Sequence, residues 1–279
     1  MVDKNLLHRM IRSFLREDVG RGDLTSESIF SQEEEGSANL VAREPLLVAG
    51  AGEVAAEVFK VQNPAIRTVV SVADGTMVPT GTVLLTVSGP IVDLLKAERV
   101  ALNLLQRLSG IATFTARFVE KVKSYPVRVT DTRKTTPGLR VLEKYAVRVG
   151  GGANHRFNLT DGVLVKDNHI AACGSIAETV TKVKQAVPHT IKVEVETDTL
   201  EQVSECLDCG VDIIMLDNMS TDMMRQAVKM IGGSALIEAS GGVNLDSIES
   251  IAACGVDIIS IGALTHSAPS CDIGMDWLA

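Results

Sequence analysis

The chain has 279 residues, of which 46% are hydrophobic and 3% aromatic, and its formal net charge is −8. This hydrophobic fraction allows a large core and excludes a wholly disordered chain. No apolar run approaches the roughly 18 residues that a membrane-spanning helix needs. The acidic balance and the scarcity of aromatic residues argue against nucleic-acid binding.

The first residues of the chain and its cysteines both indicate the cellular compartment of the protein. Apolar residues recur at helical spacing over residues 6–15, with arginines between them. This pattern predicts an amphipathic helix rather than the continuous apolar stretch of an export signal. The five cysteines, an odd number, fit a reducing compartment, so we expect a cytoplasmic protein. Cys206 and Cys209 form an isolated C-x-x-C, which we interpret as buried structural thiols.

Residues 1–110 are expected to form an N-terminal α/β sandwich domain. Short alternating segments are typical of strands, and residues 72–89 have strand–turn–strand spacing. A long helix is predicted over 93–108, ending at Gly110. Arg99 shares the apolar face of that helix, so it either snorkels at the edge of the face or reaches an anion at an interface. The pattern alone favours snorkelling.

From residue 127 onward, strand-like runs alternate with helical stretches, which is typical of parallel βα units. The runs are Val127–Thr130, Val163–Val165, Ile191–Val195, Ile213–Leu216, Ala235–Ile237 and Ile258–Ile261. Because no glycine-rich dinucleotide fingerprint follows a strand, a barrel is favoured over a doubly wound sheet. We expect residues 111–279 to form an incomplete, six- to seven-stranded α/β barrel of the TIM type, with the extreme C-terminus able to pack back on the N-terminal domain.

Polar residues follow these runs at the carboxyl ends of the predicted strands, where the active sites of such barrels gather. Between Arg128 and His169 there are eight Lys or Arg residues against four Asp or Glu residues. This segment therefore carries +4, which leaves −12 for the rest of the chain. A basic segment in an acidic chain suits a small anionic substrate.

Three kinds of chemistry can be assigned to the strand ends. A cationic cluster suited to carboxylates or phosphates comprises Arg133, Lys134, His155, Arg156 and Lys166. Two hard oxygen ligands that suit Mg²⁺ are Glu196 and Asp217. Backbone N–H groups that suit a phosphate are offered by Ser240, Gly241, Gly242, Gly262 and Ala263.

Other polar residues have simpler interpretations. Glu194 and Glu238 are interpreted as partners that hold lysines in place, and His266 as a structural or supporting residue. On a predicted helix over 137–149, Lys144 is expected to be a solvated charge. A Schiff-base role for Lys166 at its strand end stays open.

Eight motifs extend this pattern along most of the chain. They are RLSGIAT at 107–113, DTRKTTPGLR at 131–140, EKYAVRVGGGANHRFNL at 143–159, DGVLVKDNH at 161–169, VEVET at 193–197, MLDN at 215–218, EASGG at 238–242 and IGALTHS at 261–267. Together they resemble the quinolinate phosphoribosyltransferase family, the carboxylating nicotinate-nucleotide pyrophosphorylases. The long motifs are specific, because such strings rarely meet in one chain by chance.

The resemblance implies a homodimer with shared active sites and Mg²⁺ as cofactor, with no nucleic-acid or membrane partner. The implied reaction joins quinolinate to 5-phosphoribosyl 1-diphosphate and yields nicotinate mononucleotide, diphosphate and CO₂. The residues implied to hold quinolinate are Arg99 from the other subunit, Thr132, Arg133, His155, Arg156 and Lys166. This role for Arg99 replaces the snorkelling interpretation.

By the same resemblance, Lys134, Glu196 and Asp217 handle diphosphate, ribose and magnesium, and Glu196 and Asp217 are the metal ligands. The resemblance assigns the 5′-phosphate to Ser240, Gly241, Gly242, Gly262 and Ala263. Two alternatives remain: a related phosphoribosyltransferase for a monocarboxylate such as nicotinate, and a catalytically silent binder of anionic metabolites. The number of cations in the cluster argues against a monocarboxylate.

Overall fold

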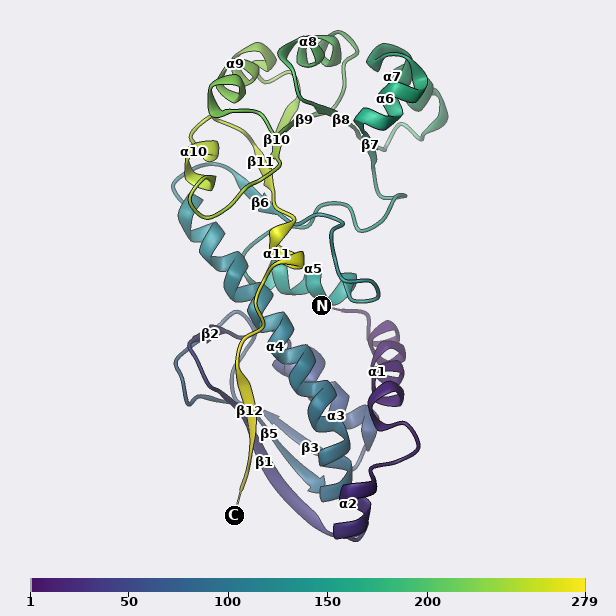
Figure 1. Ribbon diagram of the computed structural model, residues 1–279, viewed down its shortest axis with the longest axis vertical. Coiled ribbons are helices and arrows are strands. Elements are labelled where there is room, and N and C mark those ends of the chain that lie inside the picture. The colour runs from purple at the N-terminus through teal and green to yellow at the C-terminus, as the bar shows by residue number, and fades with distance from the viewer. Residues whose placement is uncertain (1, 279) are drawn as a thin grey trace. The chain divides into compact units, whose positions relative to one another are not determined.

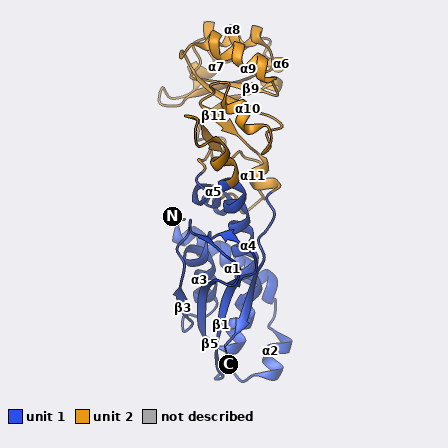
Figure 2. Ribbon diagram, turned by 90° about the vertical axis from the view of Figure 1, so that its left-hand side faces the viewer, with its two compact units in different colours: residues 1–116, 141–151, 268–279 blue, residues 117–140, 152–267 orange. Residues whose placement is uncertain are grey.

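The computed structural model describes residues 2–278, which fold into two compact units (Figure 2). Unit 1 consists of residues 1–116, 141–151 and 268–279, and unit 2 of residues 117–140 and 152–267. Within the described residues, no helix is both long enough and apolar enough to cross a lipid bilayer.

Unit 1 is built on a four-stranded antiparallel sheet with the strand order β12-β1-β5-β3. Its strands are β1 (Glu35–Ala42), β3 (Arg67–Val70), β5 (Val83–Pro90) and β12 (Ile273–Trp277). A second, two-stranded ladder joins β2 (Leu46–Leu47) to β4 (Met77–Val78). Burial nearly alternates along β5, as expected for a strand with one face on the core.

The helices of this unit are α1 (Lys4–Val19), α2 (Leu24–Ile29), a π-helical turn η1 (Ala51–Ala55) that runs into α3 (Ala56–Gln62), α4 (Ile91–Val122) and α5 (Arg140–Val149). The predicted amphipathic helix at the start of the chain is confirmed as α1, which buries Leu7, Ile11 and Leu15. Asp3 caps it by accepting a hydrogen bond from the Leu6 N–H at 2.7 Å. α1 packs on α3, and α3 packs on β3 and β5.

The predicted end of the long helix at Gly110 is wrong, because α4 continues without a break to Val122. Gly110 is required there for close packing rather than for helix termination. A Cβ atom at this position would lie 2.0 Å from the carbonyl oxygen of Pro269. The glycine therefore lets the segment that leads into β12 cross directly over the helix.

α5 begins at Arg140, three residues later than predicted, because Pro137–Leu139 form a turn. The expectation that Lys144 is a solvated charge is also wrong, since Lys144 is fully buried in α5. Next to it, the equally buried Glu143 accepts hydrogen bonds from Arg107 at 2.9 and 3.1 Å. α5 thus places charged residues in the interior of unit 1, where buried charges need partners.

Unit 2 contains a six-stranded parallel sheet with the order β6-β11-β10-β9-β8-β7, and the predicted incomplete barrel is confirmed (Figure 1). Its strands are β6 (Arg128–Thr130), β7 (Val163–Val165), β8 (Val193–Thr197), β9 (Ile213–Asp217), β10 (Leu236–Ser240) and β11 (Ile258–Ser260). Each strand matches a predicted run to within a few residues. β6 and β7 have no ladder to each other among the described residues, so the barrel stays open between them.

The helices of unit 2 are α6 (Asp167–Cys173), α7 (Ile176–Ala186), α8 (Leu200–Asp208), α9 (Thr221–Ile231), α10 (Ile248–Ala252) and α11 (Ala263–His266). α7 and α8 pack on β8, and α10 packs on β11. At the end of α8, Cys206 is buried as predicted but Cys209 is only half-buried. All five cysteines are free thiols.

Register decides which side chains share the inner face of the sheet. Met215 on β9 pairs with Glu196 on β8 and with Glu238 on β10, so these three side chains form one row. Asp217 and Ser240 pair in the next row, toward the carboxyl ends of the strands. Because side chains alternate along a strand, the polar residues of both rows point to the same face.

Candidate active site

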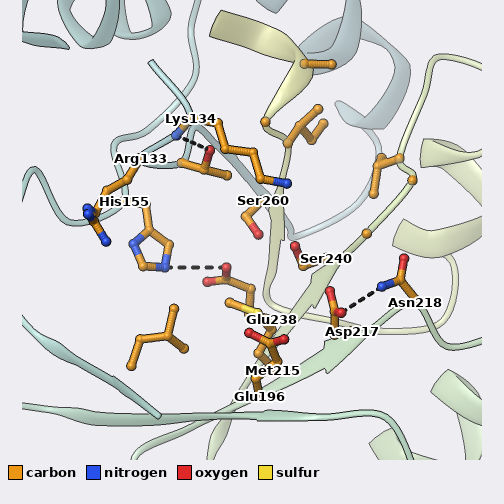
Figure 3. Close-up of a pocket in the computed structure, with 18 of the residues that line it drawn as sticks. Arg133, Lys134, His155, Glu196, Met215, Asp217, Asn218, Glu238, Ser240 and Ser260 are labelled. Carbon is orange, nitrogen blue, oxygen red and sulfur yellow. Dashed lines mark hydrogen bonds and ion pairs between the residues drawn. The ribbon is translucent and has the colours of Figure 1, made fainter. Parts of the chain in front are cut away.

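A cavity of about 770 Å³ opens at the carboxyl ends of the strands in unit 2 (Figure 3). Every site residue predicted from the sequence lines it except Arg99. These are Thr132, Arg133, Lys134, His155, Arg156, Lys166, Glu196, Asp217, Ser240, Gly241, Gly242, Gly262 and Ala263. Arg99 lies exposed on α4, in unit 1, and is not part of the lining.

A buried aspartate joins the two loops that carry most of the cations. Asp131, the first residue after β6, is fully buried and accepts hydrogen bonds from Asn154 Nδ2 at 2.6 Å and from the His155 N–H at 2.9 Å. On the other side of the first loop, Thr265 donates to the Lys134 carbonyl oxygen at 2.7 Å. Sequence reasoning did not select Asp131 as a site residue, although its place directly after a strand is the signal that marked its neighbours.

The two arginines of the cavity form an incompletely satisfied cationic pair. Arg133 Nε is buried and has no hydrogen-bond partner among the described residues. Arg156 donates to the Gly162 carbonyl oxygen at 2.8 Å, and burial together with the charge of Arg133 lowers the pKa of Arg156. An anion stabilises two guanidinium groups in this arrangement. It offsets their positive charge and can accept a hydrogen bond from the unused N–H at Arg133 Nε.

The two carboxylates predicted as metal ligands are partly paired. Lys166 Nζ lies 2.7 Å from Glu196 Oε2, which links a predicted substrate residue to a predicted metal ligand. Asn218 Nδ2 donates to Asp217 Oδ2 at 2.7 Å. Burial and the nearby charge of Glu196 raise the pKa of Asp217. A cation between the two carboxylates would relieve this repulsion, so the donor set fits a hard divalent ion.

The loops after β9 and β10 interlock through an unusual backbone conformation. Asn218 has φ +54° and is the only non-glycine residue with positive φ among the described residues. Gly241 has φ +94°, and a Cβ atom there would lie 2.2 Å from Asn218 Oδ1. Only glycine therefore fits beside Asn218, and the close approach fixes Asp217 and the glycine loop against each other.

The interpretation of Glu194 and Glu238 as lysine partners is wrong, because both face His155. His155 Nε2 lies 3.3 Å from Glu194 Oε2. It also lies 3.5 Å from Glu238 Oε1, the contact drawn in Figure 3. Burial, and next the charge of Glu194, raise the pKa of Glu238 to about 7. His266, interpreted from the sequence as a structural or supporting residue, also lines the cavity. Its place after a strand-end glycine was the available signal.

Comparison with known proteins adds an independent line of observation. The family model of the quinolinate phosphoribosyl transferase C-terminal domain matches residues 111–276, and the model of the N-terminal domain matches residues 23–109. A probable nicotinate-nucleotide pyrophosphorylase [carboxylating] of Bacillus subtilis is 47% identical over 97% of this chain and 93% of its own length. A nicotinate-nucleotide pyrophosphorylase [carboxylating] of Mycobacterium leprae is 42% identical, covering 95% of each chain.

Among solved structures, NadC from Streptococcus pyogenes superimposes with a TM-score of 0.95 at 40% identity, covering 100% of this chain and 99% of the other. The similarity therefore extends over both units and is not limited to the barrel.

Proposed function

The chain belongs to the quinolinate phosphoribosyltransferase family, and on that premise we propose that it transfers the phosphoribosyl group of 5-phosphoribosyl 1-diphosphate to quinolinate. The products are nicotinate mononucleotide, diphosphate and CO₂, a step of NAD biosynthesis. The observation that carries the proposal is the buried Nε of Arg133, which has no hydrogen-bond partner in the described part of the chain and lies in a cavity that also holds Arg156 and Lys166. A dicarboxylate is the kind of anion that such a cluster can neutralise.

The cationic residues orient the acid. Arg133, Arg156 and Lys166 hold the two carboxylates of quinolinate, and Thr132 and His155 complete the wall around them. This arrangement holds the pyridine nitrogen toward C1′ of the donor, which turns a two-body encounter into an oriented one. When the nitrogen has formed its bond to C1′, the pyridinium ring can accept the electron pair released as the 2-carboxylate leaves as CO₂.

A second group of residues in the cavity handles the phosphates. Glu196 and Asp217 would hold Mg²⁺, because they offer hard carboxylate oxygens whose mutual repulsion a cation relieves. When bound, Mg²⁺ supplies positive charge that stabilises the departing diphosphate. Lys134 adds its own charge on the same group. The 5′-phosphate sits on the loops Ser240–Gly242 and Gly262–Ala263, where glycine leaves the backbone N–H groups accessible.

We also propose that the protein is a cytoplasmic homodimer with shared active sites. Arg99, exposed on α4, would then reach the quinolinate site of the other subunit. The dimer is what membership of the family implies. The five free thiols support a reducing compartment.

The direct test supplies the purified protein with Mg²⁺, the diphosphate donor and either quinolinate or nicotinate. We expect release of CO₂ and formation of nicotinate mononucleotide with quinolinate, and neither product in the absence of the donor. Turnover of nicotinate but not quinolinate would contradict the proposal. Tight calorimetric binding of quinolinate without CO₂ release would instead identify a silent binder.

A further inference from the structure

The ring of His155 is held in one protonation state by its own backbone neighbour. The Arg156 N–H donates a hydrogen bond to His155 Nδ1 at 2.8 Å. A ring nitrogen that accepts a hydrogen bond carries no proton, so Nδ1 is the unprotonated nitrogen of this imidazole. The proton of the neutral ring is therefore on Nε2.

Nε2 faces two carboxylates that can accept its proton in a hydrogen bond. Glu194 Oε2 lies 3.3 Å away and Glu238 Oε1 lies 3.5 Å away. The side chains of these glutamates are only 5% and 2% exposed, against 15% for His155. Among residues 2–278, Oε1 of each glutamate is buried without a hydrogen-bond partner. Buried carboxylates in this state are stabilised by any donor that points at them.

We infer that Glu194 and Glu238 are positioning residues that hold His155 as the neutral tautomer protonated on Nε2. Asp131 fixes the same residue from its backbone side, through the 2.9 Å hydrogen bond from the His155 N–H. His155 then gives the cavity a fixed ring surface and no positive charge. The charge that neutralises the substrate carboxylates comes from Arg133, Arg156 and Lys166.

The same three residues, His155, Glu194 and Glu238, also lie close enough together to ligate a cation. Binding at Nε2 would require that nitrogen to lose its proton. A metal-bound histidine normally donates from its other ring nitrogen, whereas Nδ1 accepts here from Arg156. The hydrogen bond at Nδ1 therefore favours the proton over a metal ion on Nε2.

The test reads the tautomer directly from the whole protein labelled with ¹⁵N-histidine. In long-range ¹H–¹⁵N spectra at about pH 7, we expect one protonated and one unprotonated nitrogen for His155, with the proton on Nε2. The signal is assigned by its loss in His155→Gln. A doubly protonated ring, or a proton on Nδ1, would overturn the inference. A Zn²⁺ titration gives a second outcome that would overturn it. In that outcome Zn²⁺ shifts the His155 signals of the wild type and leaves those of Glu238→Gln unchanged.

Variants then separate positioning from general stability. Glu194→Gln, Glu238→Gln and the double variant keep the shape of the buried side chains and remove the ionisable carboxyl groups. We expect the double variant to raise KM for quinolinate about tenfold, to change kcat less, and to leave KM for the diphosphate donor unchanged. If the double variant does not fold, the single variants serve as the test, with smaller changes in the same direction.

The matched control is Glu201→Gln. Glu201 is an exposed glutamate on α8, so this variant should behave as wild type.

A fall in kcat with an unchanged KM for quinolinate in these variants would contradict a positioning role. This kinetic arm rests on the proposed function, whereas the spectra do not. If the wild type fails to turn over quinolinate, the proposed function fails, and the tautomer measurement still decides the inference.

Discussion

Arg133 and Glu196 line the same cavity but act on different parts of the proposed reaction. Arg133→Ala removes a guanidinium that binds the acid, and a hydrogen bond to a charged group contributes about 1.5–3 kcal/mol. We therefore expect KM for quinolinate to rise about 10- to 100-fold with a smaller change in kcat. Glu196→Gln removes a charge needed at the diphosphate side and should mainly lower kcat. Steady-state kinetics with each substrate varied will show whether the two effects separate.

Gly241 offers a second prediction on the scale of one residue. Gly241→Ala meets two costs: a positive φ, worth about 1–2 kcal/mol for a side chain, and a Cβ atom 2.2 Å from Asn218 Oδ1. Gly233→Ala is the matched control, because its φ is +85° and nothing lies within 4 Å of the new Cβ. Both variants should lose unfolding free energy in denaturant titrations. Only Gly241→Ala should also lose most of its activity, as Asn218 and Asp217 are displaced.

On the scale of elements, the crossing of α4 by the segment before β12 depends on Gly110. In an open helix, Gly→Ala would gain about 1 kcal/mol of helix stability. Here the clash with the Pro269 carbonyl oxygen outweighs that gain, so Gly110→Ala should be destabilised by more than 1 kcal/mol, an order-of-magnitude expectation. Gly162→Ala, with open space around its Cβ, should stay close to wild type. Equal stability of both variants would show that the crossing tolerates a methyl group.

Gly110 also shows where sequence patterns reach their limit. The strands of unit 2 were predictable because short apolar runs, each followed by polar residues, are a local signal. The same signal led to Arg133, Lys166 and Asp217, which the parallel sheet brings to one edge. A glycine in a helix has two local explanations, termination and close packing, and only the tertiary neighbour Pro269 distinguishes them.

The roles of buried charges were similarly out of reach of the sequence. Lys144 looked like a solvated charge because its helix carries other basic residues, yet it is fully buried. The sequence predicts lysine partners for Glu194 and Glu238, whereas the partner in the structure, His155, comes from a loop far away in the sequence. Periodicity gives the face on which a side chain lies and not the group that it meets there.

For the whole molecule, shared active sites predict complementation between two inactive variants. Arg99→Ala and Glu196→Ala are co-expressed with different tags. In a two-fold dimer, one of the two sites of each mixed dimer receives both intact residues, so random pairing restores about a quarter of the wild-type sites. The activity per chain should therefore be about a quarter of that of the wild type. The control pair, Glu196→Ala with Asp217→Ala, damages the same side of the site and should recover nothing.

Recovery in the control pair, or none in the test pair, would contradict the sharing of sites through Arg99. Full activity of Arg99→Ala alone would do the same, because no other role for this residue is proposed.

The pairing of β12 with β1 has a consequence for how the molecule is made. Ribosomes deliver β1 early and β12 as the last described strand, so the nascent chain carries an open edge of β1 throughout the synthesis of unit 2. All strands of unit 2 have been synthesised before that edge can close. The sheet of unit 1 therefore reaches its full four strands only after the sequence of the whole barrel has been made. Until β12 has been made, the outer edge of β1 offers unpaired backbone groups on which another extended chain could pair.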